Sequence, residues 1–149
     1  MVIEESILIL SPIEKVWNIF TDLTCWSKWN TVLENLSSES PRIAEGGGFR
    51  FCIRPFVIPV SFEPVIEEVV PGKKVTWRGE KFGITAVHEY IFQETEQGVS
   101  VISRETFSGN TISLSGILFS MGRLKELTLT LLKDLKEAAE SIKENGSKD

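Results

Sequence analysis

The sequence predicts an α+β fold, in which a curved antiparallel sheet of seven strands surrounds one long C-terminal helix and two short helices lie near the N-terminus. Three observations lead to this prediction. Residues 31–107 read as strands separated by short turns, residues 111–144 follow a helical period, and 149 residues suit one domain. Because only one helix is long, the sheet must curve and place that helix on its concave side.

The N-terminal residues predict a strand followed by a helix. Residues 2–10 are rich in Ile and Val, which favours a strand. Ser11-Pro12-Ile13-Glu14 then supplies an N-cap, a first-turn proline and the glutamate of a capping box. The helix that begins there has one apolar face, which must be covered by the rest of the fold; this face carries Ile13, Val16, Trp17 and Phe20.

A second short helix is predicted over residues 23–30, where Trp26 and Trp29 stand at helical spacing. Turn signals such as Gly46-Gly47-Gly48 and Pro71-Gly72 divide the next eighty residues into strands. Short connections favour antiparallel pairing, because parallel strands need long crossovers. The six strands are expected near 31–38, 48–54, 57–69, 74–80, 83–94 and 99–107.

One helix of roughly 50 Å is predicted over residues 111–144. Its apolar residues keep close to one stripe, and Gly116 and Gly122 are expected to loosen its first half. The stripe comprises Leu114, Ile117, Leu118, Met121, Leu124, Leu127, Leu131, Leu135, Ala138 and Ile142. We expect residues 1–145 to form a single domain and residues 146–149 to be a frayed tail.

Composition and charge exclude several classes of function. A net charge of −5 gives no basis for binding nucleic acid. The N-terminus does not resemble a signal peptide, and no stretch of eighteen apolar residues occurs, so we expect a cytoplasmic protein without membrane insertion. Cys25 and Cys52 stand too far apart for a zinc or redox motif and are expected to be buried thiols. No metal and no cofactor is expected.

The strands over 83–94 and 99–107 bring the chain's one histidine next to a carboxylate. If their hairpin closes with Glu94 opposite Val99, the numbers of paired residues sum to 193. This register places His88 opposite Glu105 and Tyr90 opposite Ser103, on the face that also carries Phe92.

Two interpretations of the His88 and Glu105 pair stay open. Glu105 could orient His88 so that the imidazole binds a ligand carbonyl or hydroxyl, or acts as an acid or base near its unperturbed pKa of about 6.5. Alternatively, the two side chains could form a structural pair across the strands. Around them we expect an apolar wall of ordinary core residues or of ligand contacts, formed by Phe49, Phe51, Trp77, Tyr90, Phe107, Leu118 and Met121.

The order of elements, together with several short motifs, resembles the polyketide cyclase/dehydrase-like branch of the START-like (SRPBCC) superfamily over nearly the whole chain. The motifs are Ser11-Pro12-x-Glu14-x-Val16-Trp17, Asp22, Trp29-Asn30, Trp77-Arg78-Gly79 and the hairpin His88-Glu89-Tyr90-x-Phe92, Gly98 and Arg104-Glu105-Thr106-Phe107-Ser108-Gly109. The resemblance implies a helix-grip fold with a cavity between the sheet and the long helix.

That superfamily contains enzymes, carriers and interaction modules, so the resemblance leaves three functions open. The first is binding or transport of an apolar small molecule or lipid. The second is a cyclase- or dehydratase-type enzyme with His88 and Glu105 as acid and base. The third is a co-chaperone-like interaction module, which would expose an apolar patch.

Overall fold

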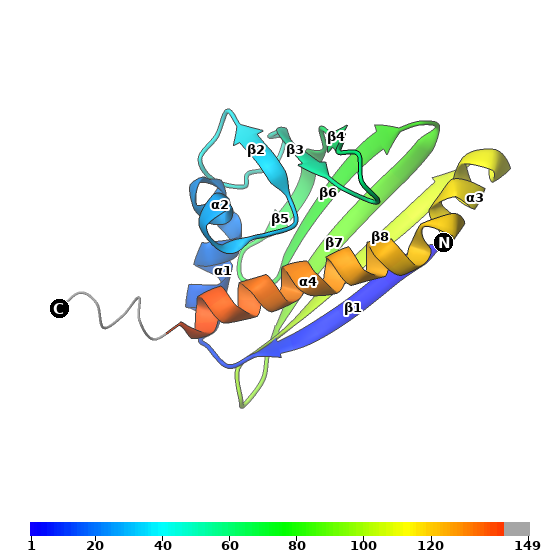
Figure 1. Ribbon diagram of the computed structural model, residues 1–149. Coiled ribbons are helices and arrows are strands. Elements are labelled where there is room, and N and C mark those ends of the chain that lie inside the picture. Colours follow the sequence, from blue (N-terminus) through cyan, green and yellow to red (C-terminus); the bar gives the residue numbers. More distant parts are fainter. Residues whose placement is uncertain (142–149) are drawn as a thin grey trace.

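The computed structural model describes residues 1–141 and shows an antiparallel sheet crossed by a long helix (Figure 1). The strands are β1 (Val2–Ile9), β2 (Glu34–Ser38), β3 (Phe49–Ile53), β4 (Val60–Phe62), β5 (Val65–Val70), β6 (Lys74–Lys81), β7 (Ile84–Glu94) and β8 (Val99–Gly109). The helices are α1 (Ile13–Thr21), the 3₁₀ turn η1 (Leu23–Cys25), α2 (Trp26–Trp29), α3 (Thr111–Phe119) and α4 (Met121–Glu140). The α+β class with a curved antiparallel sheet is confirmed, and the arrangement is consistent with a helix-grip fold.

The strands form two sheets rather than the one seven-stranded sheet that was predicted. The larger sheet has the order β1-β8-β7-β6-β5, and the smaller one has the order β2-β3-β4. The expected strand over 57–69 is in fact two strands that belong to different sheets, separated at Glu63 and Pro64. Pro64 has no N–H with which to continue a ladder, so the pairing stops there and the chain passes to the other sheet.

The helix α4 lies across the concave face of the larger sheet (Figure 1). Its C-terminal half buries Leu131, Leu132 and Leu135 in the main hydrophobic core. Polar contacts fix this half to the end of β1: Lys136 Nζ donates to the carbonyl oxygen of Leu8 at 2.8 Å, and Glu140 accepts from the Leu10 N–H at 2.7 Å. The C-terminal half of α4 is therefore firmly attached to the sheet.

The single helix predicted over 111–144 is interrupted at Ser120. Ser120 is the C-cap of α3 and the N-cap of α4: its N–H donates to the carbonyls of Gly116 and Ile117, and its carbonyl accepts from the N–H of Leu124. Gly116 and Gly122 flank this break, in agreement with the expected loosening. The predicted end of the helix, including Ile142, and the predicted tail over 146–149 lie outside the described residues.

Two local predictions were wrong: the capping box at the start of α1 and the full burial of the two cysteines. Pro12, in an extended conformation, is the N-cap of α1, and no side chain closes a capping box. The carbonyl of Pro12 accepts from the N–H groups of Lys15 and Val16 instead. Cys25 and Cys52 are free thiols, as expected, but both are half-buried rather than buried.

Candidate functional site

The central hairpin has the predicted register. In β7 and β8, His88 pairs with Glu105 and Tyr90 pairs with Ser103. On the other side of β7, Trp77 of β6 pairs with His88. Because side chains of paired residues share a face, these five side chains project from the sheet on the side that α4 crosses.

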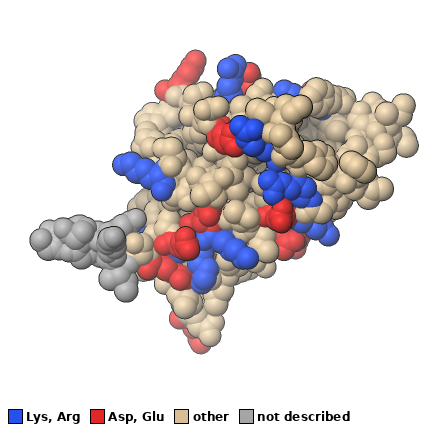
Figure 2. Space-filling model, in the orientation of Figure 1, with Lys and Arg blue, Asp and Glu red and all other residues tan. Residues whose placement is uncertain are grey.

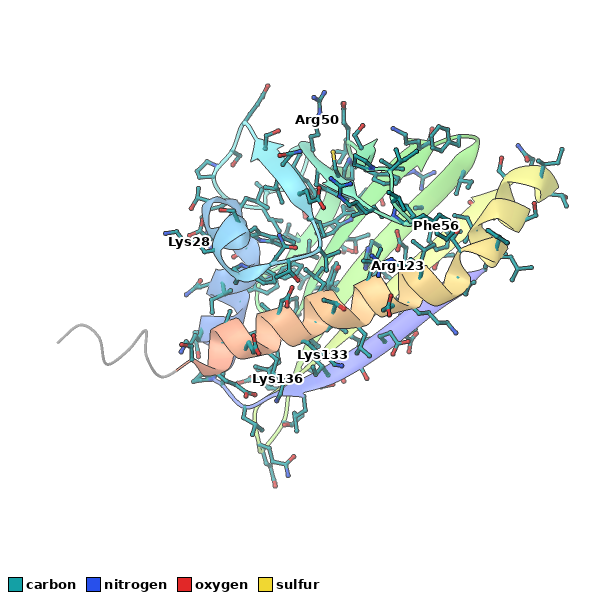
Figure 3. All side chains as sticks on the ribbon, viewed as in Figure 1. Lys28, Arg50, Phe56, Arg123, Lys133 and Lys136 are labelled. Carbon is teal, nitrogen blue, oxygen red and sulfur yellow. The ribbon has the colours of Figure 1, made fainter. Side chains whose placement is uncertain are left out.

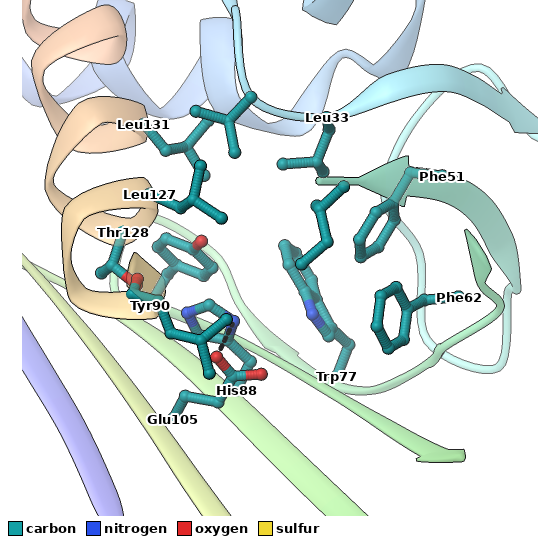
Figure 4. Close-up of a pocket in the computed structure, with 13 residues that line it drawn as sticks. Leu33, Phe51, Phe62, Trp77, His88, Tyr90, Glu105, Leu127, Thr128 and Leu131 are labelled. Carbon is teal, nitrogen blue, oxygen red and sulfur yellow. Dashed lines mark hydrogen bonds and ion pairs between the residues drawn. The ribbon is translucent and has the colours of Figure 1, made fainter. Parts of the chain in front are cut away.

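A cavity of about 100 Å³ lies between this face and α4 (Figure 4). Aromatic side chains form one wall and leucines of α4 form another, so its lining is mostly apolar. The lining residues are Val32, Leu33, Phe51, Ile53, Phe62, Trp77, His88, Tyr90, Glu105, Leu124, Leu127, Thr128 and Leu131.

A second cavity of about 220 Å³ adjoins the first toward the N-terminal end of α4. The two cavities share four lining residues, namely Ile53, Phe62, Glu105 and Leu124. The rest of the second lining comprises Pro55, Val60, Gly79, Glu80, Lys81, Phe82, Ile84, Ala86, Phe107, Ile117 and Ser120. Glu105 is therefore a charged or polar group at the boundary between two apolar spaces.

Ser103, rather than Glu105, is the hydrogen-bond partner of His88. His88 Nε2 lies 2.7 Å from Ser103 Oγ, and the serine is fully buried. His88 Nδ1 lies 3.8 Å from Glu105 Oε1, which is longer than a hydrogen bond. The predicted register already placed Ser103 diagonally beside His88 on the same face. A hydrogen bond between these two residues could therefore have been predicted from the sequence.

Burial sets the protonation of the three titratable groups. It lowers the pKa of His88 from 6.5 to about 3, so the imidazole is neutral at physiological pH. It raises the pKa of Glu105 from 4.5 to about 7. Burial, followed by the charge of Glu105, also raises the pKa of the Tyr90 phenol, which therefore stays protonated. The lowered pKa argues against the interpretation in which His88 acts as an acid or base near 6.5, and Glu105 titrates near neutrality instead.

The Glu105 carboxyl group retains its hydrogen-bonding capacity. Its side chain keeps a quarter of its surface accessible, and that surface faces the cavities that it lines. Within residues 1–141 it makes no hydrogen bond, and the cationic or potentially cationic group within 4 Å of it is His88. A polar group of a bound molecule could therefore satisfy it without breaking a bond inside the protein.

The structure brings most of the predicted site residues together. Phe51, Trp77, His88, Tyr90 and Glu105 line the first cavity, and Phe107 lines the second. The remaining predicted members, Phe49, Leu118 and Met121, line neither cavity, and Phe49 is instead buried in the main core. Sequence reasoning missed Phe62 and Thr128, and it noted Leu124, Leu127 and Leu131 as parts of the helical stripe without assigning them to the site.

Leu118 and Met121 do not line either cavity. Leu118 lies in α3 with 63% of its surface exposed, and Met121 is half-buried at the start of α4. Both were expected at the site because a single helix would carry them on the stripe that faces the sheet. The break at Ser120 interrupts that stripe, so Leu118 turns away from the face of Leu124, whereas Ile117 still lines the second cavity with Leu124.

Residues 1–141 contain no helix with the length and apolar character needed to cross a bilayer. The same residues contain no cluster of three or more His, Cys, Asp or Glu side chains arranged to hold a metal ion.

Comparison with known proteins identifies a matching family model and several similar solved structures. A family model described as polyketide cyclase / dehydrase and lipid transport matches residues 1–145. No curated protein matches the chain. Three similar solved structures are a hypothetical protein of Helicobacter pylori, the protein TTHA0849 of Thermus thermophilus, and the di-domain ARO/CYC protein BexL from the BE-7585A biosynthetic pathway.

The structural likeness is close although the sequences have diverged. The Helicobacter protein is 16% identical with a TM-score of 0.78, over 94% of this chain and 88% of its own. The Thermus protein is 18% identical with a TM-score of 0.78, over 95% of this chain and 100% of its own. BexL is 16% identical with a TM-score of 0.77, over 95% of this chain but 50% of its own. At these identities the likeness concerns the fold.

Proposed function

Since the chain belongs to the polyketide cyclase/dehydrase and lipid-transport family, we propose that it binds an uncharged apolar small molecule in the two adjoining cavities. The observation that carries this proposal is the Glu105 carboxyl group, which makes no hydrogen bond within residues 1–141 and lies in the mostly apolar lining of both cavities. Apolar cavities with few, well-placed polar groups are typical of sites for small molecules. A carrier or binding protein needs nothing more.

The state of Glu105 favours a ligand with a carbonyl or hydroxyl group. With a pKa of about 7, the carboxyl group can donate to a carbonyl oxygen when protonated and accept from a hydroxyl group when ionised. An anionic ligand would place two negative charges close together in a poorly solvated space, which is costly. The proposed ligand is therefore neutral and mostly hydrocarbon, with its polar group near the boundary of the two cavities.

Glu105 also supports a second candidate function, that of a cyclase- or dehydratase-type enzyme. General acid–base catalysis is most efficient when the pKa of the catalytic group lies near the working pH, and Glu105 meets this condition. His88, with a pKa of about 3, would remain neutral and act as a hydrogen-bonding group held by Ser103. In this alternative Glu105, rather than His88, would transfer the proton.

The proposal is tested by native mass spectrometry of the purified protein, followed by organic extraction and identification of any bound compound. We expect a retained neutral apolar compound, or saturable uptake of an uncharged hydrophobic fluorescent probe. Leu124→Trp should reduce probe uptake by filling the shared wall of both cavities. Leu8→Trp is the matched control, because Leu8 lies on the face of β1 that points away from α4 and the cavities. Probe uptake that is absent, or equal in both variants, would contradict a ligand in the cavities and favour an interaction module.

Glu105→Gln and His88→Ala separate binding from catalysis. If the protein is a carrier, Glu105→Gln should bind the extracted compound or the probe with a modest change in affinity, because glutamine can still donate and accept. If the protein is an enzyme, Glu105→Gln should abolish conversion of the extracted compound while binding persists. A His88→Ala variant that loses stability but keeps its affinity would assign His88 a structural role only.

A further inference from the structure

Large apolar side chains are exposed together at one end of the molecule. They come from the loop between β3 and β4, from the turn between β6 and β7, and from α3. We call this surface the apolar tip, and its members are Phe56, Val57, Ile58, Phe82, Ile112, Leu118 and Phe119. Ile112 is 84% exposed and Phe119 is 83% exposed, so most of the surface of each side chain is uncovered within residues 1–141.

The three segments of the apolar tip lie side by side. The rings of Phe56 and Phe119 are 6.1 Å apart between centroids, which joins the β3–β4 loop to the end of α3. The Ser113 hydroxyl of α3 donates to the Phe82 carbonyl at 2.8 Å, which joins α3 to the β6–β7 turn. The exposed residues therefore form one surface rather than scattered single contacts.

The segments that form this surface are unusual in composition. Residues 106–122 and 55–62 contain no charged residue, and none of the nine residues of α3 is buried. Figure 2 shows the same end as a region without Lys, Arg, Asp or Glu side chains. A surface helix ordinarily buries one apolar stripe and exposes a polar face, so α3 lacks the polar face that water would favour.

Three cations stand around the base of the apolar tip. Lys81 Nζ lies 5.3 Å from the centroid of the Phe82 ring. Arg54 is the first residue of the β3–β4 loop, and Arg123 lies in the first turn of α4; Figure 3 labels Phe56 on that loop and Arg123 near the N-terminal end of α4. Arg54 and Arg123 pair with Glu34 and Glu126 on the exposed surface, and such pairs are weak enough to exchange one anionic partner for another.

We propose that the apolar tip docks on the surface of a lipid bilayer, with Ile112, Leu118 and Phe119 entering the acyl boundary and the three cations facing lipid phosphates. Apolar groups next to cations are the arrangement that favours the bilayer interface. The shape supports this occupant over a second copy of the chain. In Figure 1, α3 projects beyond the sheet as a narrow end, whereas a symmetric protein interface requires a broad self-complementary face.

The second cavity is lined in part by segments of the apolar tip. Pro55, Phe82 and Ile117 belong to the segments of the tip and also line that cavity. A docked tip would therefore place the cavity next to the hydrocarbon of the bilayer, from which an apolar molecule could pass without crossing water. This exchange rests on the proposed function, whereas docking itself requires no ligand.

Sedimentation of the full chain with phosphatidylcholine vesicles tests the docking in the absence of any ligand. We expect the wild-type protein to sediment with the vesicles, and Ile112→Ser/Phe119→Ser to bind about tenfold more weakly or worse, because two large apolar side chains are lost from the contact. Leu8→Ser/Val65→Ser removes two exposed apolar side chains from the outer face of the larger sheet, and it should bind like the wild type.

Three results would overturn the proposal. The first is a wild-type protein that stays in the supernatant, and the second is equal binding by the two double variants. The third is a wild-type dimer in light scattering that becomes a monomer in Ile112→Ser/Phe119→Ser, which would assign the tip to a protein interface. Circular dichroism of both variants establishes that they are folded. Because probe uptake is measured without vesicles, a failure of docking is distinguishable from a failure of the ligand proposal.

Discussion

Glu105 is the residue whose environment differs most from that of an ordinary carboxylate. It projects from β8 into the space between two apolar cavities, and burial raises its pKa to about 7. The Nδ1 atom of His88 is 3.8 Å away and belongs to a neutral ring, so it does little to stabilise a charge. The protein therefore maintains a polar group at a cost in stability, which is typical of functional sites.

The raised pKa of Glu105 predicts a specific dependence of stability on pH. The folded protein binds this proton more tightly than the unfolded chain does, so the contribution is fully present below pH 4.5 and is lost as the pH rises through about 7. Relative to the wild type, Glu105→Gln should gain up to roughly 3 kcal/mol in the free energy of unfolding across this range. Urea titrations at a series of pH values measure the difference. Glu96→Gln, at the exposed β7–β8 turn, is the matched control substitution.

His88 should show the opposite dependence. Its pKa falls from 6.5 to about 3 on folding, so its contribution is present above pH 6.5 and is lost as the pH falls toward 3. Because the chain has one histidine, its imidazole signals in NMR spectra are unambiguous. We expect these signals to remain those of a neutral ring at pH 5. A midpoint near 6.5 in the folded protein would contradict the buried position of the ring.

At the level of elements, two glycines predict contrasting effects of substitution by alanine. A Cβ atom at Gly98, in the β7–β8 turn, would overlap the backbone of Ile9 at the end of β1. Gly98→Ala should therefore lower the free energy of unfolding by about 2 kcal/mol or more. A Cβ atom at Gly116 in α3 would meet nothing within 4 Å. Gly116→Ala should keep or slightly raise stability through helix propensity, and thermal unfolding of both variants compares them. Equal melting temperatures would refute the close approach at Gly98.

The elements that sequence predicted well are those determined by local rules. The β7–β8 hairpin has a short turn, so one assumed pair fixes the register of every other residue, including His88 and Glu105. The boundary between β4 and β5 was missed although Pro64 marks it, because the apolar residues on both sides of the proline read as one strand. The break at Ser120 was missed because the apolar pattern continues through it, and periodicity alone does not reveal where a helix leaves the sheet.

The candidate site was predictable to the extent that it depends on the sheet. Residues on β3, β6, β7 and β8 reach the cavities because strand alternation fixes their face. The contributions of Phe62 and Thr128 depend on how the smaller sheet and α4 are placed, which no local pattern determines. The protonation of Glu105 likewise depends on the burial that this packing creates.

On the scale of the whole molecule, one end is tightly packed and the other is open. The main core joins α1, α2 and the C-terminal half of α4 to the sheet, and polar contacts of Lys136 and Glu140 reinforce it. At the opposite end, α3 buries none of its residues. Hydrogen exchange should therefore be slow for amides of Leu131–Ala139 and much faster for those of α3. Equal protection of the two helices would contradict this division of the molecule.

The lining of the second cavity lies almost wholly outside the main core; Ile53 packs against that core from its edge. Mutations at Val60, Ile84, Ala86 or Ile117 would therefore reshape the cavity while the contacts that hold the fold stay in place. Descendants of one ancestral chain could acquire different ligands through such changes without first acquiring extra stability. The same separation recommends these four positions for a library that seeks binders of new compounds on this scaffold.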